Sequence, residues 1–237
     1  MDKKVFSFIF ARGGSKGIPN KNLRLIDNIP LVGHSIKIAQ ETNYVDKVFV
    51  STDSDLIANT AKAFKAEVIK RPNSISKDES PEWLAWKHAV NYVNNKYGEF
   101  DVFLSLPATS PLRSIDDINN CIKLYLNNQF ESVISIVKSD RSPWFNMVKK
   151  SKNNNLNLLL DKKNISRRQD SPESYDITTV AYVIDPKFIL NANNIWERDV
   201  LGVEIPKERA IDIDNLFDFK VANFLYHENK EKRNIEI

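Results

Sequence analysis

Two kinds of hydrophobic pattern alternate along the chain. Short apolar runs without helical spacing are typical of strands buried on both faces, and they span residues 5–10, 47–50, 102–106 and 132–137. Apolar residues recur at helical spacing over residues 31–41, 55–64 and 82–97. This alternation predicts a three-layer α/β/α domain, in which helices cover both faces of a mostly parallel sheet.

Polar residues mark the starts of the predicted helices. Ser54 and Ser114 each precede a helical segment and are expected to cap it. Ser80 is expected to cap the helix over residues 82–97, with Pro81 in its first turn. The pattern closes with short strands over residues 180–184 and about 203–205, and with a helix over residues 216–228.

The alternation stops between residues 138 and 176. This stretch holds three consecutive asparagines, several charges and the pair Trp144-Phe145, without a clear period. A loop of this length inside a compact domain is usually functional or disordered. The aromatic pair and the leucine-rich run over residues 156–160 favour a packed excursion from the domain.

The composition indicates one domain spanning residues 1–237. Hydrophobic residues make up 42% of the chain and charged residues 27%, as in ordinary soluble proteins. The formal net charge is +3 with basic residues scattered among acidic ones, which argues against a nucleic-acid partner. No uncharged apolar run reaches about 18 residues and no signal-peptide pattern begins the chain, so we expect a cytoplasmic protein without a membrane partner.

A loop with two glycine sites and three cations follows the first predicted strand. Glycine lets phosphate oxygens approach backbone N–H groups closely, and cations can neutralise their charge. The order of residues matches neither the Walker A loop nor the dinucleotide pattern G-x-G-x-x-G. A solvated turn is the alternative, but the interleaved cations favour a triphosphate cradle. Its members are Ala11, Arg12, Gly13, Gly14, Ser15, Lys16, Lys21 and Asn22.

Two further polar segments, residues 51–54 and 107–113, also follow strands directly. Ligands of such sheets bind beyond the carboxyl ends of the strands, so these segments should converge with the cradle along one rim. Asp53 and Ser54 can equally serve as helix caps.

Acidic and basic pairs near the end of the chain suggest further chemistry. Asp212 and Asp214 alternate with isoleucines, as on a strand edge with one acidic face. Two carboxylates on one face suit magnesium, whereas a solvated strand is the alternative. The planar guanidinium groups of Arg167 and Arg168 suit a carboxylate ligand, unless they are only exposed charges.

Six motifs in consistent order resemble those of the acylneuraminate cytidylyltransferase family, whose members activate sialic-acid-like sugars as CMP conjugates. They are the loop 11–22, Val50-Ser51-Thr52-Asp53-Ser54, Arg71-Pro72 with Asp78 and Ser80-Pro81, Thr109-Ser110-Pro111-Leu112-Arg113, Arg167-Arg168-Gln169-Asp170, and Ile211-Asp212-Ile213-Asp214. The resemblance implies a nucleotide-diphospho-sugar transferase-like fold. It also implies that CTP reacts with a 3-deoxy-2-keto sugar acid, such as sialic, legionaminic or pseudaminic acid, and that residues 138–176 form a dimerisation insertion of a homodimer.

The resemblance also assigns roles to single residues. Arg12 and Lys21 match residues that hold the phosphates, with Lys21 nearest the α-phosphate, and Asp212 and Asp214 match a magnesium-binding pair. Arg12, Lys21 and Asp212 form the implied catalytic set. The nucleotide is further expected to meet Ser51, Arg71 and Asp78. The sugar is expected to meet Pro107, Thr109, Ser110, Arg168, Gln169, Thr178 and Thr179.

The chain departs from the family on the sugar side. Pro107-Ala108 stands where many members carry Gln-Pro, and Thr178-Thr179 stands where many carry Asn-Gly. An altered acceptor pocket, with N-acetylneuraminate as a poor substrate, is therefore expected. A CMP-Kdo synthetase is one alternative, although such relatives usually carry Gly-Lys in place of Lys21-Asn22. A catalytically idle nucleotide-binding homologue is another, against which the retained Lys21 and Asp212 argue.

Overall fold

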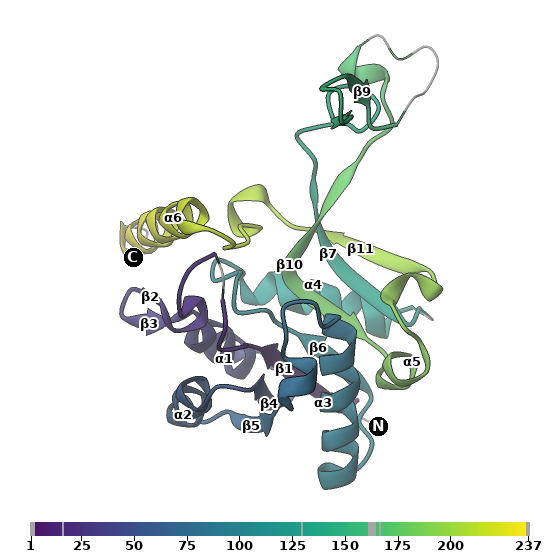
Figure 1. The fold of residues 1–237 in the computed structure, drawn as a ribbon. Coiled ribbons are helices and arrows are strands. Elements are labelled where there is room, and N and C mark those ends of the chain that lie inside the picture. The colour runs from purple at the N-terminus through teal and green to yellow at the C-terminus, as the bar shows by residue number, and fades with distance from the viewer. Residues whose placement is uncertain (1–2, 16, 129, 161–164, 166, 236–237) are drawn as a thin grey trace.

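The computed structural model describes residues 3–235 except 16, 129, 161–164 and 166 (Figure 1). Seven strands form the central sheet: β1 (Val5–Phe10), β4 (Val45–Thr52), β5 (Glu67–Lys70), β6 (Val102–Ser105), β7 (Ser132–Lys138), β10 (Tyr175–Ile184) and β11 (Val200–Glu204). Their order across the sheet is β11-β7-β10-β6-β1-β4-β5. Within this sheet β10 pairs antiparallel with both neighbours, and all other pairs are parallel. The predicted mostly parallel sheet is confirmed.

Helices cover both faces of this sheet. One face carries α1 (Leu31–Glu41), α2 (Asp55–Ala63) and α4 (Ile115–Leu126), and the other carries α3 (Glu82–Tyr97) and α5 (Pro186–Asn191). Alternate residues of β1 serve the two layers, as expected for a strand buried on both sides. Ile9 packs in the first apolar cluster, whereas Phe8 stacks between Phe49 and Phe103 in the second. The three-layer α/β/α architecture is therefore confirmed.

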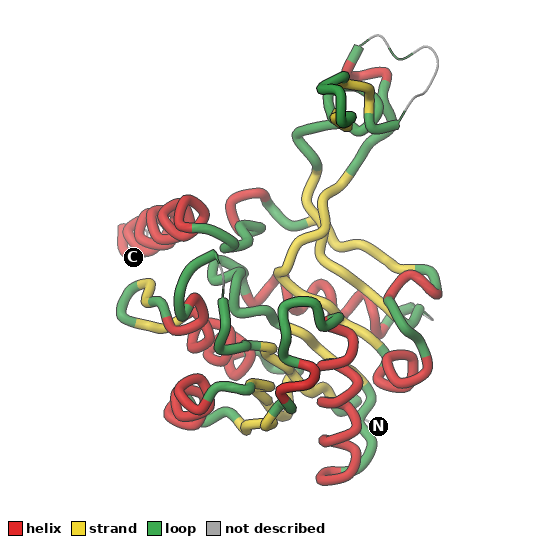
Figure 2. Tube along the Cα trace, viewed as in Figure 1, coloured by secondary structure: helices red, strands yellow, loops and turns green. Residues whose placement is uncertain are grey.

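The segment between β7 and β10 forms an arm and a small lobe (Figures 1 and 2). β7 and β10 continue side by side beyond the helical layers, with Lys138 paired to Tyr175 near the lobe. The lobe contains the hairpin of β8 (Val148–Lys150) and β9 (Leu156–Leu158). The predicted packed excursion thus has its own secondary structure.

The last helix closes the carboxyl-end rim of the sheet. α6 (Leu216–Ile235) places Ala222 in a third apolar cluster with Ile18 and Leu31. The small hairpin of β2 (Leu25–Ile26) and β3 (Ile29–Pro30) joins this cluster through Ile26. No helix in the described part of the chain combines the length and apolar character needed to cross a bilayer.

Two of the three predicted helix caps are confirmed. The Ser54 side chain accepts a hydrogen bond from the backbone N–H of Ile57, and Ser114 forms a reciprocal capping box with Asp117. Ser80 does not cap α3, because the helix begins at Glu82 and its cap position is Pro81, which has no side-chain acceptor.

Several strand predictions need correction. β5 was missed, β10 begins five residues before the predicted strand at 180, and β11 covers 200–204 instead of 203–205. Residues 211–214 form no strand. The predicted strand with one acidic face is therefore wrong, and so is the alternative of a solvated strand. The backbone N–H of Ile213 donates one hydrogen bond to the Thr109 carbonyl, and the Ile213 side chain is fully buried. Residues 211–214 therefore form a packed loop in which Ile213 is buried, Ile211 and Asp212 are half-buried and Asp214 is exposed.

Candidate active site

Three hydrogen bonds fix the loop that follows β1. The N–H of Ala11 donates to the Ser51 carbonyl at 3.1 Å, and the N–H of Gly13 donates to Asp53 Oδ1 at 2.9 Å. Farther along, Asn22 Nδ2 donates to the Arg12 carbonyl at 3.0 Å and so closes the loop on itself. Asp53 therefore anchors the predicted cradle. Lys16, which belongs to the predicted phosphate-binding set, lies outside the described residues.

Gly17 lets this loop touch the segment that carries the two aspartates. A Cβ atom at Gly17 would lie 2.2 Å from the carbonyl oxygen of Asp214, which is too close for any side chain. The glycine therefore serves a close contact between two backbones. This contact brings residues 211–214 to the loop after β1.

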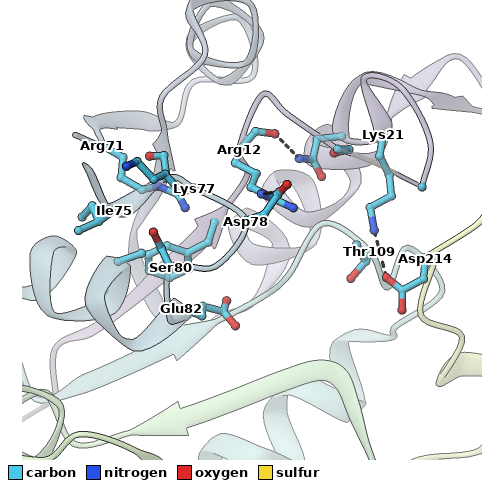
Figure 3. A pocket seen from close by; sticks show the side chains of 16 residues that line it. Arg12, Lys21, Arg71, Ile75, Lys77, Asp78, Ser80, Glu82, Thr109 and Asp214 are labelled. Atoms are coloured by element: carbon cyan, nitrogen blue, oxygen red, sulfur yellow. Dashed lines mark hydrogen bonds and ion pairs between the residues drawn. The ribbon is translucent and has the colours of Figure 1, made fainter. Parts of the chain in front are cut away.

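A cavity of about 380 Å³ opens between the loop after β1 and the segment that leads into α3 (Figure 3). Its volume suits a small-molecule ligand. Of the predicted site residues, it is lined by Arg12, Ser15, Lys21, Asn22, Arg71, Asp78, Thr109 and Asp214. Its remaining lining residues are Phe10, Gly17, Ile75, Ser76, Lys77, Ser80, Glu82 and Ala85.

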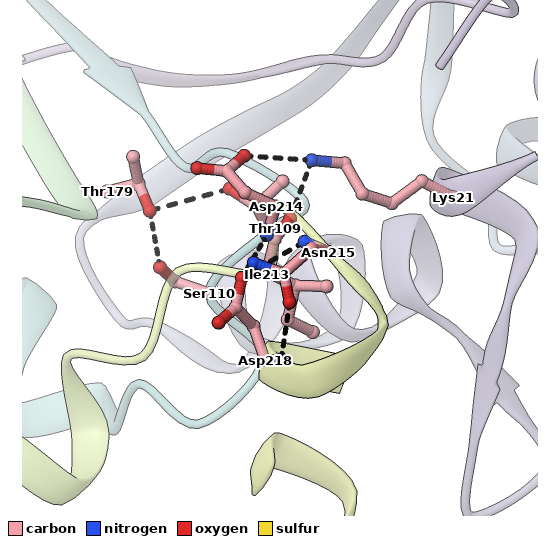
Figure 4. A network of polar contacts seen from close by, with 8 residues as sticks. All are labelled: Lys21, Thr109, Ser110, Thr179, Ile213, Asp214, Asn215 and Asp218. Atoms are coloured by element: carbon pink, nitrogen blue, oxygen red, sulfur yellow. Dashed lines mark hydrogen bonds and ion pairs between the residues drawn. The ribbon is translucent and has the colours of Figure 1, made fainter. Parts of the chain in front are cut away.

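Lys21 is held at one end of this cavity (Figures 3 and 4). Its Nζ donates to the Ile213 carbonyl at 2.6 Å and lies 3.3 Å from Asp214 Oδ1. The Lys21 side chain is 15% exposed, whereas that of Asp214 is 76% exposed. The ammonium is thus fixed by a buried carbonyl, while the aspartate remains open to a ligand. Arg12, also at the cavity, forms an ion pair with Asp78.

Arg71 lies buried at the opposite end of the cavity. Its Nη2 donates to the Ser51 carbonyl at 2.6 Å, and its guanidinium lies 5.9 Å from the centre of the Phe10 ring. Its Nε has no hydrogen-bond partner among the described residues. Ser51 itself is fully buried and does not line the cavity. The structure therefore places Ser51 behind the wall, where its carbonyl positions Arg71 and Ala11.

Asp212 lies behind the Lys21 end, on the same loop as Asp214. Burial raises the pKa of Asp212, and the neighbouring hydroxyls of Thr109 and Thr179 partly oppose this shift. The charge of Asp214 raises the pKa of Asp212 further. Asp212 Oδ1 is buried and has no hydrogen-bond partner among the described residues. This carboxylate therefore has an oxygen available to a cation.

The hydroxyl residues expected to meet the sugar form a wall in which Thr109 lines the cavity, whereas Ser110 and Thr178 are buried behind it (Figure 4). Ser110 Oγ and Thr179 Oγ1 lie 2.6 Å apart, and Thr109 Oγ1 lies 3.4 Å from the same Thr179 oxygen. Thr178 is buried and donates to Ser135 Oγ at 2.7 Å. The wall thus consists of side chains that are already hydrogen-bonded to one another.

Arg113 supports this wall from inside the protein. Its Nη2 donates to the carbonyls of Thr179, at 3.0 Å, and of Pro107, while its Nη1 donates to Ser35 Oγ at 2.8 Å. Burial lowers the pKa of Arg113 to about 9, which still leaves the guanidinium charged at neutral pH. Pro107 therefore contributes its carbonyl to this internal network and does not line the cavity.

The structure does not bring Arg168 and Gln169 to this cavity. They lie in a short 3-10 helix in the segment between β7 and β10, and they line a separate hollow together with Lys138 and Arg141. Arg167 pairs with Asp170 in the same turn. Within one chain, the predicted carboxylate-binding arginines are thus separate from the cations of the cradle.

Sequence reasoning missed Glu82, whose side chain enters the cavity from the first turn of α3 (Figure 3). Burial raises the pKa of the Glu82 carboxyl, and the indole N–H of Trp86 and the charge of Arg71 only partly oppose this shift. An acidic residue in a first helical turn is ordinarily explained by the helix dipole. No local sequence pattern therefore indicates that Glu82 faces a cavity.

Comparisons with known proteins identify the family of the chain. A family model described as cytidylyltransferase matches residues 7–230. Post-translational flagellin modification protein B of Campylobacter coli is 29% identical, over 95% of this chain and 96% of its own. CMP-N,N'-diacetyllegionaminic acid synthase of Campylobacter jejuni is 30% identical over 94% of each chain.

A solved structure has the same fold. A CMP:2-keto-3-deoxy-manno-octonic acid synthetase complexed with CTP superposes with a TM-score of 0.71 over 95% of this chain and 99% of its own. The two sequences are 16% identical, so this likeness shows the fold alone.

The fold and the site define an α/β protein with a cavity lined by cations and carboxylates at the carboxyl ends of its parallel strands. The family match over most of the chain makes the assignment specific. The chain belongs to the cytidylyltransferase family and is a nucleotidyltransferase. The resemblance read from the six sequence motifs is thereby confirmed.

Proposed function

We propose that the protein joins CTP to a 3-deoxy-2-keto sugar acid and releases a CMP-sugar and pyrophosphate. The observation that carries this proposal is the cavity in which Arg12, Lys21 and Arg71 face one space beside Asp214. Cations such as these neutralise the charge of a triphosphate, and a cytidine nucleotide agrees with the match to the cytidylyltransferase family. The name of the Campylobacter jejuni relative, a CMP-N,N'-diacetyllegionaminic acid synthase, and its coverage of 94% of each chain support a sugar-acid acceptor.

In the reaction, the anomeric hydroxyl oxygen attacks the α-phosphorus in line, and the bond from that phosphorus to the bridging β-oxygen breaks. The hydroxyl proton is lost and pyrophosphate leaves. Catalysis of such transfers rests on positioning and on charge stabilisation. Lys21, fixed by the Ile213 carbonyl, is preorganised to stabilise charge on the α-phosphate. Arg12 would hold the leaving phosphates, with Asp78 keeping its guanidinium at the cavity.

Magnesium fits the carboxylates of this site. Asp212 Oδ1 is buried without a described partner, and Asp214 is open to the cavity. Magnesium prefers such oxygen ligands together with substrate phosphates and water. Asp212 and Asp214 would hold the ion. When bound, it would neutralise phosphate charge during the transfer.

The acceptor side supports a sugar other than N-acetylneuraminate. Thr178 is hydrogen-bonded to Ser135, and Ser110 is hydrogen-bonded to Thr179, so these hydroxyls are engaged within the protein. Pro107 has no side-chain hydrogen bond to offer. A site that lacks a matched polar partner discriminates strongly against the substituent that needs one.

We further propose a homodimer formed through the lobe. The lobe exposes large apolar side chains, which a partner surface would cover. They are Phe145, Val148, Leu156, Leu158, Leu159 and Leu160. In such a dimer, Arg168 and Gln169 would lie near the active site of the second subunit and bind the acceptor carboxylate there.

The experiment for this proposal is a panel of 2-keto sugar acids assayed for pyrophosphate release with CTP and magnesium. We expect one acid of the legionaminic or a related type to turn over with kcat/KM of at least about 10⁴ M⁻¹s⁻¹. N-acetylneuraminate should react far more slowly. Equal turnover of N-acetylneuraminate would refute the altered pocket, and release with none of the acids would refute the proposed reaction.

A further inference from the structure

The cavity is lined by one acidic side chain that the proposed reaction does not use, the carboxylate of Glu82. It projects from the start of α3 into the space between the loop after β1 and residues 71–81 (Figure 3). Glu82 forms no ion pair within 4 Å with the described residues and plays no capping role in α3. Its carboxyl group therefore lines the ligand space without an ion-pair partner among the described residues.

The two ends of the cavity differ in chemistry. Lys21 and Asp214 mark one end, and Thr109 lies beside them. The other end combines apolar side chains of Phe10, Ile75 and Ala85 with the fixed guanidinium of Arg71, and the Lys77 side chain lies beside Arg71 (Figure 3). Apolar walls with a few fixed polar groups are typical of sites for flat heterocycles.

Charge decides which part of CTP can lie against Glu82. A carboxylate repels the phosphates, which the cations Arg12 and Lys21 attract. The base is uncharged and can therefore occupy the end that holds Arg71, Glu82 and the apolar side chains. Cytosine carries an exocyclic amino group beside ring acceptors, and acidic side chains accept hydrogen bonds from that amino group.

We propose that Glu82 selects cytosine by accepting a hydrogen bond from the exocyclic amino group of the base, while Arg71 donates to the ring acceptors. This assignment rests on the proposed function, because it places a cytidine nucleotide in the cavity. Uracil has a carbonyl oxygen where cytosine has the amino group, and that oxygen would face the Glu82 carboxylate without a proton between them. Glu82 thus acts as a specificity-determining residue, with Arg71 as its donor partner.

The test measures binding of CDP and of UDP by calorimetry to wild type, Glu82→Gln and Glu82→Ala, without acceptor. The Gln amide can both accept and donate, so it suits either base. We expect Glu82→Gln to reduce the preference for CDP over UDP at least about tenfold, the scale of a base-edge contact. Glu82→Ala should weaken CDP binding, because the acceptor for the amino group is lost, and should not weaken UDP binding, because the carboxylate that opposes the uracil oxygen is removed.

Glu79→Gln is the matched control, because Glu79 is exposed on the same segment and does not line the cavity. It should keep the wild-type preference, and melting curves should show all three variants folded. An unchanged preference in both Glu82 variants would overturn the assignment, as would an equal loss of both nucleotides, which indicates a contact to ribose or phosphate. If wild type binds neither nucleotide, the proposed function itself fails, and the assignment with it.

Discussion

The close contact at Gly17 makes a prediction whose size follows from the structure. In Gly17→Ala, the new Cβ would lie 2.2 Å from the Asp214 carbonyl oxygen, whereas such contacts are rarely closer than 3.0 Å. The two backbones must then separate by about 0.8 Å, and Asp214 moves relative to Lys21. A misplacement of about 1 Å can cost roughly a hundredfold in rate. We therefore expect kcat/KM to fall by roughly a hundredfold with the fold retained.

The assay is pyrophosphate release with CTP and the best acceptor, beside a thermal melt of each variant. Gly202→Ala is the control, because its Cβ would lie 2.7 Å from Ile136 Cδ1, the movable end of a side chain, on an edge strand. It introduces the same methyl group and a similar steric conflict away from the cavity, so it should lower stability slightly and leave kcat/KM unchanged. Wild-type kinetics in Gly17→Ala would show that the contact does not position Asp214.

Three further predictions concern charge, stability and assembly. Lys21→Ala should lose about 3 kcal/mol of transition-state stabilisation, hence roughly a hundredfold in kcat, and wild-type turnover by a folded variant would contradict its role. Burial of Asp117 would raise its pKa, but hydrogen bonds from Arg209 and Ser114 outweigh that effect and lower it. The ionised carboxylate therefore stabilises the folded protein fully above the usual carboxyl pKa, and this stabilisation is lost as the pH falls through the lowered pKa. Asp117→Asn should accordingly lower the free energy of unfolding by about 2–3 kcal/mol at pH 7. The difference between variant and wild type should shrink in acid, and a difference in chemical denaturation that does not change with pH would contradict this account. Sedimentation should give twice the chain mass of 27.3 kDa, whereas a stable monomer at micromolar concentration would contradict the dimer.

Much of the fold could be predicted because its signals are local. Buried strands such as residues 5–10 read as continuous apolar runs, and helices show apolar residues at helical spacing. β5 escaped because it is a four-residue edge strand with a charged residue at each end. The first half of β10 escaped because Asp176, Thr178 and Thr179 interrupt it, so that it shows no continuous apolar run.

The site could be predicted only in part, for a different physical reason. Family motifs marked Lys21, Arg71 and Asp214, and the fold brings these to one cavity. The alternation around Asp212 is also consistent with a loop that buries Ile213, and only tertiary packing decides between loop and strand. Glu82 faces the cavity because residues 71–81 place the start of α3 there, and no local pattern encodes that placement.

Transfer of the α-phosphate is the central claim, and isotope labelling tests it most directly. The protein would be incubated with the preferred 2-keto sugar acid, magnesium and CTP labelled either at the α- or at the γ-phosphorus, with separation of the products. We predict that the α-label appears in a CMP-sugar and the γ-label in pyrophosphate, in equal amounts. Label from the γ-position on the sugar, or release of inorganic phosphate without a CMP-sugar, would contradict the account.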